Sequence, residues 1–93
     1  MAVVLMSDTP GMTAQQYETV IADLGLAEKL PPGCQAHIAG PGPDGAWRVV
    51  TVWDELDTAR DFMTTTLRPA WARAGVTPPS SPPINWPLHK IFV

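Results

Sequence analysis

The sequence predicts an α+β domain with the element order β-α-β-β-α-β, the ferredoxin-like arrangement in which two helices cover one face of a four-stranded antiparallel sheet. Three observations lead to this prediction. Four short apolar segments and two amphipathic segments follow one another in that order, and a Pro/Gly-rich turn joins the middle two apolar segments. The third observation is residues 45–53, a strand that is apolar on both faces. A chain of 93 residues is expected to form one domain over residues 1–93.

The first strand and the first helix have clear boundaries in the sequence. Residues 2–7 form an apolar run that ends at the turn-forming residues 8–11. Thr13 can cap a helix, and Gln16, three residues later, can complete a capping box. Apolar residues then recur at helical spacing until Gly25, which suits a left-handed C-cap. The pattern predicts a strand, a turn and a helix that ends near Gly25.

The two middle strands, residues 34–40 and 45–53, are predicted to pair as a hairpin around the turn at 41–45. Successive side chains of a strand point to opposite faces, so the second of these strands has two faces. One face carries Trp47, Val49, Thr51 and Trp53, and the other carries Ala46, Arg48, Val50 and Val52. Helices cover only one face, so we expect the other to be covered by a second copy of the chain or by a ligand. We expect the face with Trp47 and Trp53 to line the pocket.

A second helix is predicted from about residue 54, with apolar residues along its inner face. Pro69 should kink or restart it, and Gly75 should end the last helical piece. A Pro/Ser-rich connector at 77–83 then leads to a closing strand at 85–93, which we expect at a sheet edge because Pro87 cannot donate to a ladder.

Composition excludes several classes of function. The net charge is −3, and the six Lys and Arg residues form no basic stripe, so nucleic acid is not an expected partner. No segment is long and apolar enough for a signal peptide or a membrane span, and the lone Cys34 agrees with a reducing compartment, so a cytoplasmic protein is expected. No phosphate-binding glycine loop or metal-ligand cluster occurs, and no cofactor is expected.

Nearly the whole chain resembles the dimeric α/β-barrel superfamily, in particular the small antibiotic biosynthesis monooxygenase-like domains. The resemblance is carried by residues 31–40 and 45–55, by Phe62 with residues 67–69, and by residues 87–89. It implies a homodimer and a small apolar or aromatic ligand. Relatives of this architecture include cofactor-free oxygenases, haem-degrading enzymes, polyketide cyclases and isomerases, so the fold does not select one chemistry.

Histidines are the candidate acid–base groups. His37 is the only ionisable residue in the second strand, and a buried neutral imidazole there could act as a general base. The alternative is a histidine hydrogen-bonded for structural reasons. The cyclase-type resemblance suggests a second candidate, a pairing of His89 with Tyr17, although Tyr17 also suits packing at the start of its helix.

Large apolar side chains are the candidate substrate-binding residues. The four tryptophans, Trp47, Trp53, Trp71 and Trp86, either line a pocket for a flat aromatic molecule or fill the core and dimer interface. Met63 belongs to the core by default and could reach the pocket. Arg48 needs a carboxylate partner on a neighbouring strand or across the dimer, or it anchors a substrate carboxylate.

These residues lead to three functional hypotheses. The first is a cofactor-independent enzyme of small-molecule, secondary metabolism, which resembles monooxygenases that act on aromatic or polyketide-like substrates. The second is a polyketide cyclase or isomerase with histidine acid–base chemistry, and the third is a non-catalytic dimeric protein that binds a hydrophobic ligand. The first two require His37 and at least two tryptophans to line one cavity between sheet and helices.

Overall fold

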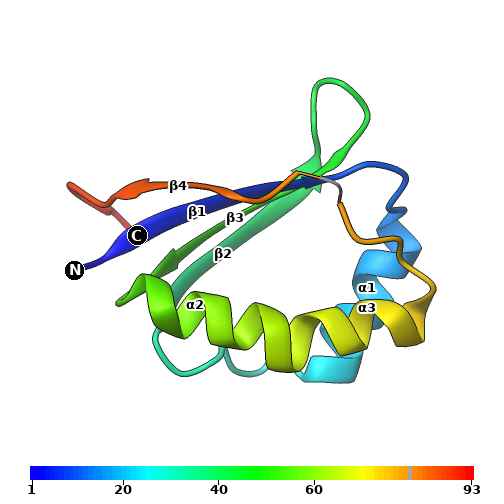
Figure 1. Cartoon of the computed structure of the whole chain (residues 1–93), viewed down its shortest axis with the longest axis horizontal. Helices are drawn as coiled ribbons and strands as arrows, with labels where there is room; N and C mark the ends of the chain where they lie inside the picture. The colour runs from blue at the N-terminus through cyan, green and yellow to red at the C-terminus, as the bar shows by residue number, and fades with distance from the viewer. Residues whose placement is uncertain (80) are drawn as a thin grey trace.

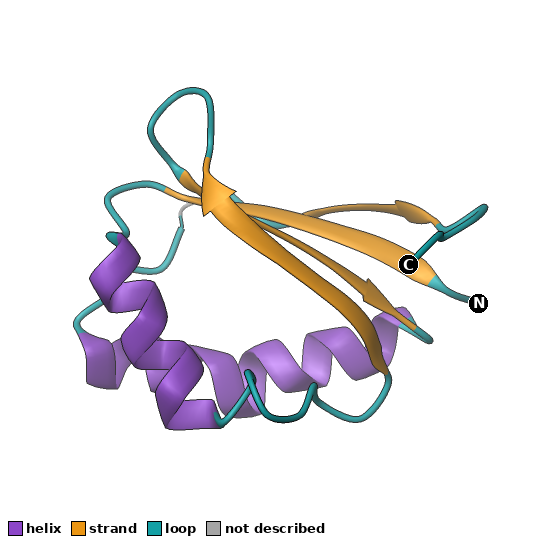
Figure 2. Ribbon diagram, turned by 180° about the vertical axis from the view of Figure 1, so that it is seen from behind, coloured by secondary structure: helices purple, strands orange, loops and turns teal. Residues whose placement is uncertain are grey.

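The computed structural model describes residues 1–79 and 81–93, and its elements follow the predicted order. The four strands form one antiparallel sheet with the strand order β2-β3-β1-β4. All helices lie on one side of this sheet, and no helix covers the other side in the described part of the chain (Figures 1 and 2). The elements are β1 (Val3–Thr9), α1 (Ala14–Leu24), β2 (Cys34–Pro41), β3 (Trp47–Trp53), α2 (Leu56–Phe62), the π-helical turn η1 (Met63–Leu67), α3 (Arg68–Ala74) and β4 (Ile84–Pro87).

Helix α1 begins and ends at the predicted caps. The Thr13 hydroxyl accepts the backbone N–H of Gln16 at 3.0 Å, and the Gln16 side chain accepts the backbone N–H of Thr13 at 3.0 Å. At the other end, Gly25 has φ of 66°, which is the left-handed conformation of a C-cap glycine. Local hydrogen bonds therefore define both ends of this helix.

The hairpin of β2 and β3 contains an irregularity that the sequence pattern did not indicate. Cys34 pairs with Trp53 and Ala36 pairs with Val52, so Gln35 is an extra residue opposite β3. Such a β-bulge reverses the alternation of side chains along the strand that contains it. Cys34 and His37 consequently both lie on the helix-covered face, which strict alternation would forbid.

The second helical region has no gap at Pro69, but a new helical piece begins there as predicted, because η1 ends at Leu67 and α3 starts at Arg68, one residue before the proline. The π-helical turn η1 lies directly before α3, and the backbone N–H of Arg68 donates to the carbonyl of Met63, five residues earlier. The Thr65 hydroxyl donates to the carbonyl of Asp61 at 2.7 Å. Proline has no N–H and its ring collides with the carbonyl four residues earlier in a regular helix. The wider π turn accommodates this ring without breaking the helix.

Strand β4 is shorter than the predicted segment 85–93. It ends at Pro87, which pairs with Val3, the first residue of β1. β4 is an edge strand and pairs only with β1 among the strands of the described chain. One further hydrogen bond joins the backbone N–H of Leu88 to the carbonyl of Ala2 at 2.9 Å, and residues 88–93 have no regular structure.

Two clusters of buried side chains fill the space between sheet and helices. One lies between α1 and α3 and includes Val20, Ala70 and Trp71, while the other joins β1, Trp53 and Ala59 of α2. The alternating residues on the opposite face of the sheet include Ile38, Ile84 and Trp86, which are 66%, 59% and 42% exposed. Most buried side chains thus lie on the helix side, while Val4 and Val52, 8% and 7% exposed, are buried on the opposite face.

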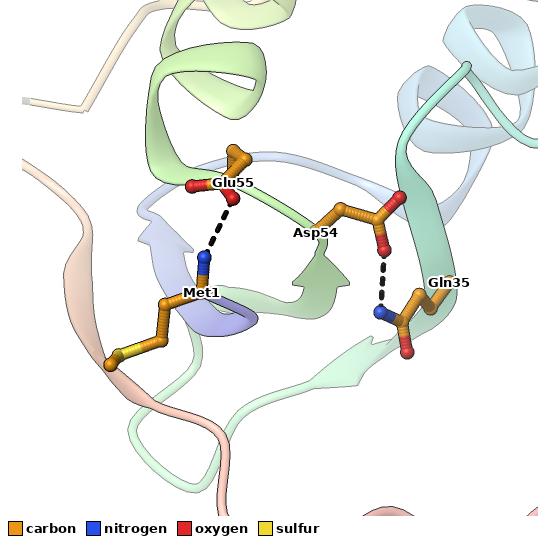
Figure 3. Close-up of polar contacts among 4 residues, drawn as sticks. All are labelled: Met1, Gln35, Asp54 and Glu55. Atoms are coloured by element: carbon orange, nitrogen blue, oxygen red, sulfur yellow. Dashed lines mark hydrogen bonds and ion pairs between the residues drawn. The ribbon is translucent and has the colours of Figure 1, made fainter.

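Polar contacts tie the end of the sheet to the start of α2 (Figure 3). The Gln35 side chain donates to the Asp54 carboxylate at 2.6 Å, and the backbone N–H of Asp54 donates to the carbonyl of Gly33 at 2.8 Å. The N-terminal amino group of Met1 pairs with Glu55 at 2.6 Å. These contacts position the connection that brings α2 beneath the sheet.

Candidate active site

A small apolar cavity of about 60 Å³ lies between the sheet and the helices. Strands β1, β2 and β3 form its roof, and α1, α2, η1 and α3 form its floor. Most wall residues are aliphatic or aromatic, while the polar side chains among them belong to Ser7, Thr9, Tyr17, Cys34, His37 and Thr51. An apolar cavity with a few polar groups is the usual form of a small-molecule site.

Tyr17 and His37 form the central polar contact of this cavity. The Tyr17 hydroxyl lies 2.7 Å from Nε2 of His37, and both side chains are partly buried. Helix α1 supplies Tyr17 from its first turn, and β2 supplies His37 opposite Thr51. The two residues are 20 positions apart, so the contact depends on how α1 packs against the sheet.

Burial keeps this pair uncharged near neutral pH. Desolvation lowers the pKa of His37 below its ordinary value of 6.5. Desolvation, with a smaller contribution from the charge of Glu18, raises the pKa of Tyr17 above 10.0. A neutral imidazole hydrogen-bonded to a neutral phenol can accept a proton from a bound ligand, and the tautomer determines which ring nitrogen does so.

Three of the predicted substrate-binding residues line this cavity. Trp53 and Trp71 are buried in its walls, and Met63 of η1 is half-buried there. The indole N–H of Trp53 donates to the Thr51 hydroxyl at 2.9 Å, which satisfies the polar atoms of both side chains. His37 and two tryptophans therefore line one cavity.

Trp47 lies on the same face of β3 but does not line the cavity. Its ring packs against Tyr17 with the ring centroids 5.1 Å apart. Its indole N–H is buried without a hydrogen-bond partner among the described residues. Trp47 therefore packs against Tyr17 without being part of the cavity wall.

Three other predicted site residues lie elsewhere. Arg48 is on the opposite face of the sheet, where it forms two hydrogen bonds of 2.8 and 2.9 Å to Asp8 on the neighbouring strand β1. This pairing, which lowers the pKa of Asp8, satisfies the guanidinium without a substrate carboxylate. Trp86 pairs in register with Val4 and also lies on that opposite face.

His89 follows β4 in the irregular C-terminal segment and is exposed. Across residues 1–79 and 81–93, it lines neither cavity and makes no hydrogen bond with Tyr17, whose hydroxyl contacts His37 instead. The predicted pairing of His89 with Tyr17 is therefore not formed. The strand that was expected to carry His89 ends two residues earlier, at Pro87.

Cys34 is a cavity residue that the sequence pattern did not indicate. It faces the cavity because of the bulge at Gln35, and burial raises the pKa of its thiol. A neutral thiol is a poor base and nucleophile, so His37 is the better candidate for proton transfer. No signal in a single sequence marks the bulge, because Gln35 is compatible with a regular strand.

Neither a metal site nor a membrane span is found in the described residues. No group of three or more His, Cys, Asp or Glu side chains could hold a metal ion among residues 1–79 and 81–93. Within the same ranges, none of the helices has the length and apolar composition to cross a membrane.

Comparison with solved structures identifies the class of fold. The sheet and its helices have the ferredoxin-like fold of antibiotic biosynthesis monooxygenase-like domains, as the resemblance in the sequence implied. The sequence itself matches no protein-family model and no curated protein.

The individual similarities extend over nearly whole chains. A protein of Chloroflexus aurantiacus, described as an antibiotic biosynthesis monooxygenase, superposes with a TM-score of 0.68 at 15% identity, over 100% of this chain and 98% of that chain. SnoaB, a cofactor-independent oxygenase from Streptomyces nogalater, gives 0.62 at 15% identity, over 97% and 94%. A hydroxynitrile lyase from Passiflora edulis gives 0.51 at 16% identity, over 99% and 94%. The likeness at these identities concerns the fold.

Proposed function

We propose that this protein is a cofactor-independent enzyme of small-molecule metabolism, in which His37 acts as the general base on an aromatic or polyketide-like substrate. The observation that carries the proposal is the 2.7 Å contact between Tyr17 and His37 in the wall of an apolar cavity. The similarity of fold to a cofactor-independent oxygenase supports the choice of reaction.

The proposed reaction requires the protein to carry out one proton transfer. His37 accepts a proton at Nδ1 from a phenol or an acidic C–H of the substrate, in the tautomer whose Nε2–H donates to the Tyr17 hydroxyl oxygen, and this contact orients the imidazole. The resulting electron-rich substrate anion reacts directly with O₂. The protein therefore needs only to bind, orient and deprotonate the substrate. For a CH₂ group that becomes a C=O group, one O₂ is consumed and one water is released for each product molecule.

Assays of oxygen uptake with anthrone as the probe test this proposal. We expect one O₂ per anthraquinone formed, and His37→Gln should reduce kcat/KM by about 100-fold or more, the usual contribution of a general base. His89→Gln is the matched control, because His89 is exposed and lines neither cavity. Equal turnover by the His37→Gln variant and the unaltered protein would contradict the assignment of the base.

A second candidate function is acid–base catalysis without oxygen, as in a cyclase or isomerase. The Tyr17–His37 pair can both accept and return a proton, and a lyase shares the fold. Product formation under argon from an enolisable polyketide-like substrate would favour this reaction. Tight ligand binding without turnover under either atmosphere would instead favour the non-catalytic binding protein.

We also propose that the functional unit is a homodimer in which a second copy covers the open face of the sheet. Ile38, Ile84 and Trp86 on that face are exposed, and no helix of the described chain covers them. The charged residues Arg48 and Asp8 on the same face already neutralise one another. An apolar sheet face of this kind is typical of an association surface.

A further inference from the structure

A second cavity of about 200 Å³ adjoins the first, between the helical run of α2 and η1 and the segment that leads into β4. Its walls differ in character from those of the first cavity. Arg60, Arg68, Thr64 and Asn85 contribute polar groups, beside apolar residues such as Leu56 and Pro83. This cavity therefore combines apolar surface with two arginine side chains.

The π turn places these polar groups on one wall. Arg60, Thr64 and Arg68 are spaced four residues apart and all line the cavity. In a regular α-helix, residues eight apart are rotated about 80° from one another around the axis. The turn η1 holds more residues per turn and removes much of this rotation, so both arginines line the same cavity.

Both arginines remain available to a ligand. Arg60 approaches Asp57 only at 3.9 Å, on the helix surface, with exposed fractions of 67% and 95% for the two side chains, and pairs of this kind contribute little. Arg68 has no ion pair among the residues that the structure describes. By contrast, Arg48 and Arg73 each contact a carboxylate at 2.8 Å.

The two cavities share part of their walls. Leu5 and Met63 line both of them, so these two side chains separate one cavity from the other. The first cavity, at about 60 Å³, is well below the roughly 300–1,000 Å³ of typical ligand pockets. A methionine side chain is flexible and adapts its shape readily to a ligand. A ligand whose ring contacts His37 therefore has room to extend past Met63 toward the arginines only through its substituents.

We infer that the second cavity is a carboxylate-binding subsite, in which Arg60 and Arg68 hold the acidic group of an aromatic acid whose ring lies in the first cavity. A carboxylate matches the planar fork of a guanidinium, and the apolar part of the cavity accommodates the adjoining carbon atoms. The inference deepens the proposed function, since it adds a substrate class to the same site. It does not depend on whether His37 is a base.

The test compares the binding of 2-naphthoate and the uncharged 2-naphthamide at about pH 8, where the carboxyl group is ionised. Tryptophan fluorescence reports binding, because Trp53 and Trp71 line the first cavity. We expect the unaltered protein to prefer 2-naphthoate, and Arg60→Gln/Arg68→Gln to lose about tenfold or more of this preference, as for charge-assisted hydrogen bonds. The control Lys29→Gln/Lys90→Gln removes the same charge at exposed positions that line neither cavity, and should retain the preference.

Each other outcome would overturn the inference. These outcomes are no binding of 2-naphthoate to the unaltered protein, an undiminished preference in the arginine variant, or an equal loss in the lysine control. Circular dichroism melting of the arginine variant checks its fold, which we expect to persist because both arginines are exposed. If His37→Gln leaves turnover intact while the arginine variant loses the preference, the proposed general base is wrong and the subsite stands.

Discussion

Burial in the cavity gives His37 and Tyr17 the uncharged state that a general base and its hydrogen-bonding partner need. The polar neighbours of the pair are hydroxyl and thiol groups, and among residues 1–79 and 81–93 no carboxylate or guanidinium lines the first cavity to stabilise a charged imidazole. The neutral form of His37 is therefore favoured over a wider pH range than for a histidine in water.

This state leads to a prediction for the titration of His37. Because burial lowers its pKa in the folded protein, the His37 ring signals in NMR spectra should titrate with a midpoint below 6.5. His37 therefore binds a proton at higher pH in the unfolded chain than in the folded chain. Its contribution lowers the free energy of unfolding as the pH falls below about 6.5. The free energy of unfolding of the unaltered protein should fall relative to that of His37→Gln across this range. His89→Gln identifies the remaining ring signals, and a His37 midpoint at or above 6.5 would show that the ring is solvated.

At the scale of elements, short-range hydrogen bonds explain the boundaries of α1, whereas α2, η1 and α3 begin without a side-chain cap. The capping box of α1 lies within four residues and was visible in the sequence. The bulge at Gln35 and the π turn η1 are local insertions that rotate the residues following them. Both occur beside the cavities, where such features commonly redirect side chains toward functional sites.

The capping box provides a test at this scale. Thr13→Ala removes the hydroxyl that accepts the Gln16 N–H, and we expect a loss of about 1 kcal/mol in the free energy of unfolding, the typical value for an N-cap. Denaturant unfolding measures the change. The matched control is Thr19→Ala in the same helix, because the Thr19 hydroxyl donates to the Gln15 carbonyl at an exposed position and alanine favours the helix interior. Equal losses for the two variants would contradict a specific role for the cap.

At the scale of the whole molecule, the sheet separates two surfaces with different roles. One face, with the helices, encloses both cavities, and the other presents apolar side chains and a neutralised ion pair. A small domain buries a limited share of its surface, so pairing two open faces would enlarge its core considerably.

The proposed dimer leads to a prediction about oligomeric state. Ile38→Lys places a charge on the open face, on the edge strand β2, where Ile38 is 66% exposed, and should convert a dimer to a monomer in size-exclusion chromatography with light scattering. Gln15→Lys adds the same side chain to an exposed position of α1 and should leave the dimer intact. An unaltered protein that is monomeric at all concentrations would refute the proposal.

The positions of the predicted site residues show which of them strand and helix spacing can place and which it cannot. Trp53 and Trp71 face the cavity as expected, since their neighbours follow regular strand and helix spacing. Trp86 lies on the opposite face because its register with β1 is determined by the sheet, which local sequence does not encode. Arg60 and Arg68 were not predicted as site residues, because their juxtaposition depends on the π turn.

The sequence by itself determined the order of the elements, the caps of α1 and the presence of a strand with two apolar faces, because these depend on residues within one or two turns of each other. Only the tertiary structure decided that Tyr17 meets His37, that Asp8 satisfies Arg48 and that Met63 separates two cavities. Each of these contacts joins distant segments, through strand register and helix rotation. Both are outcomes of packing the whole chain, so no local pattern contains them.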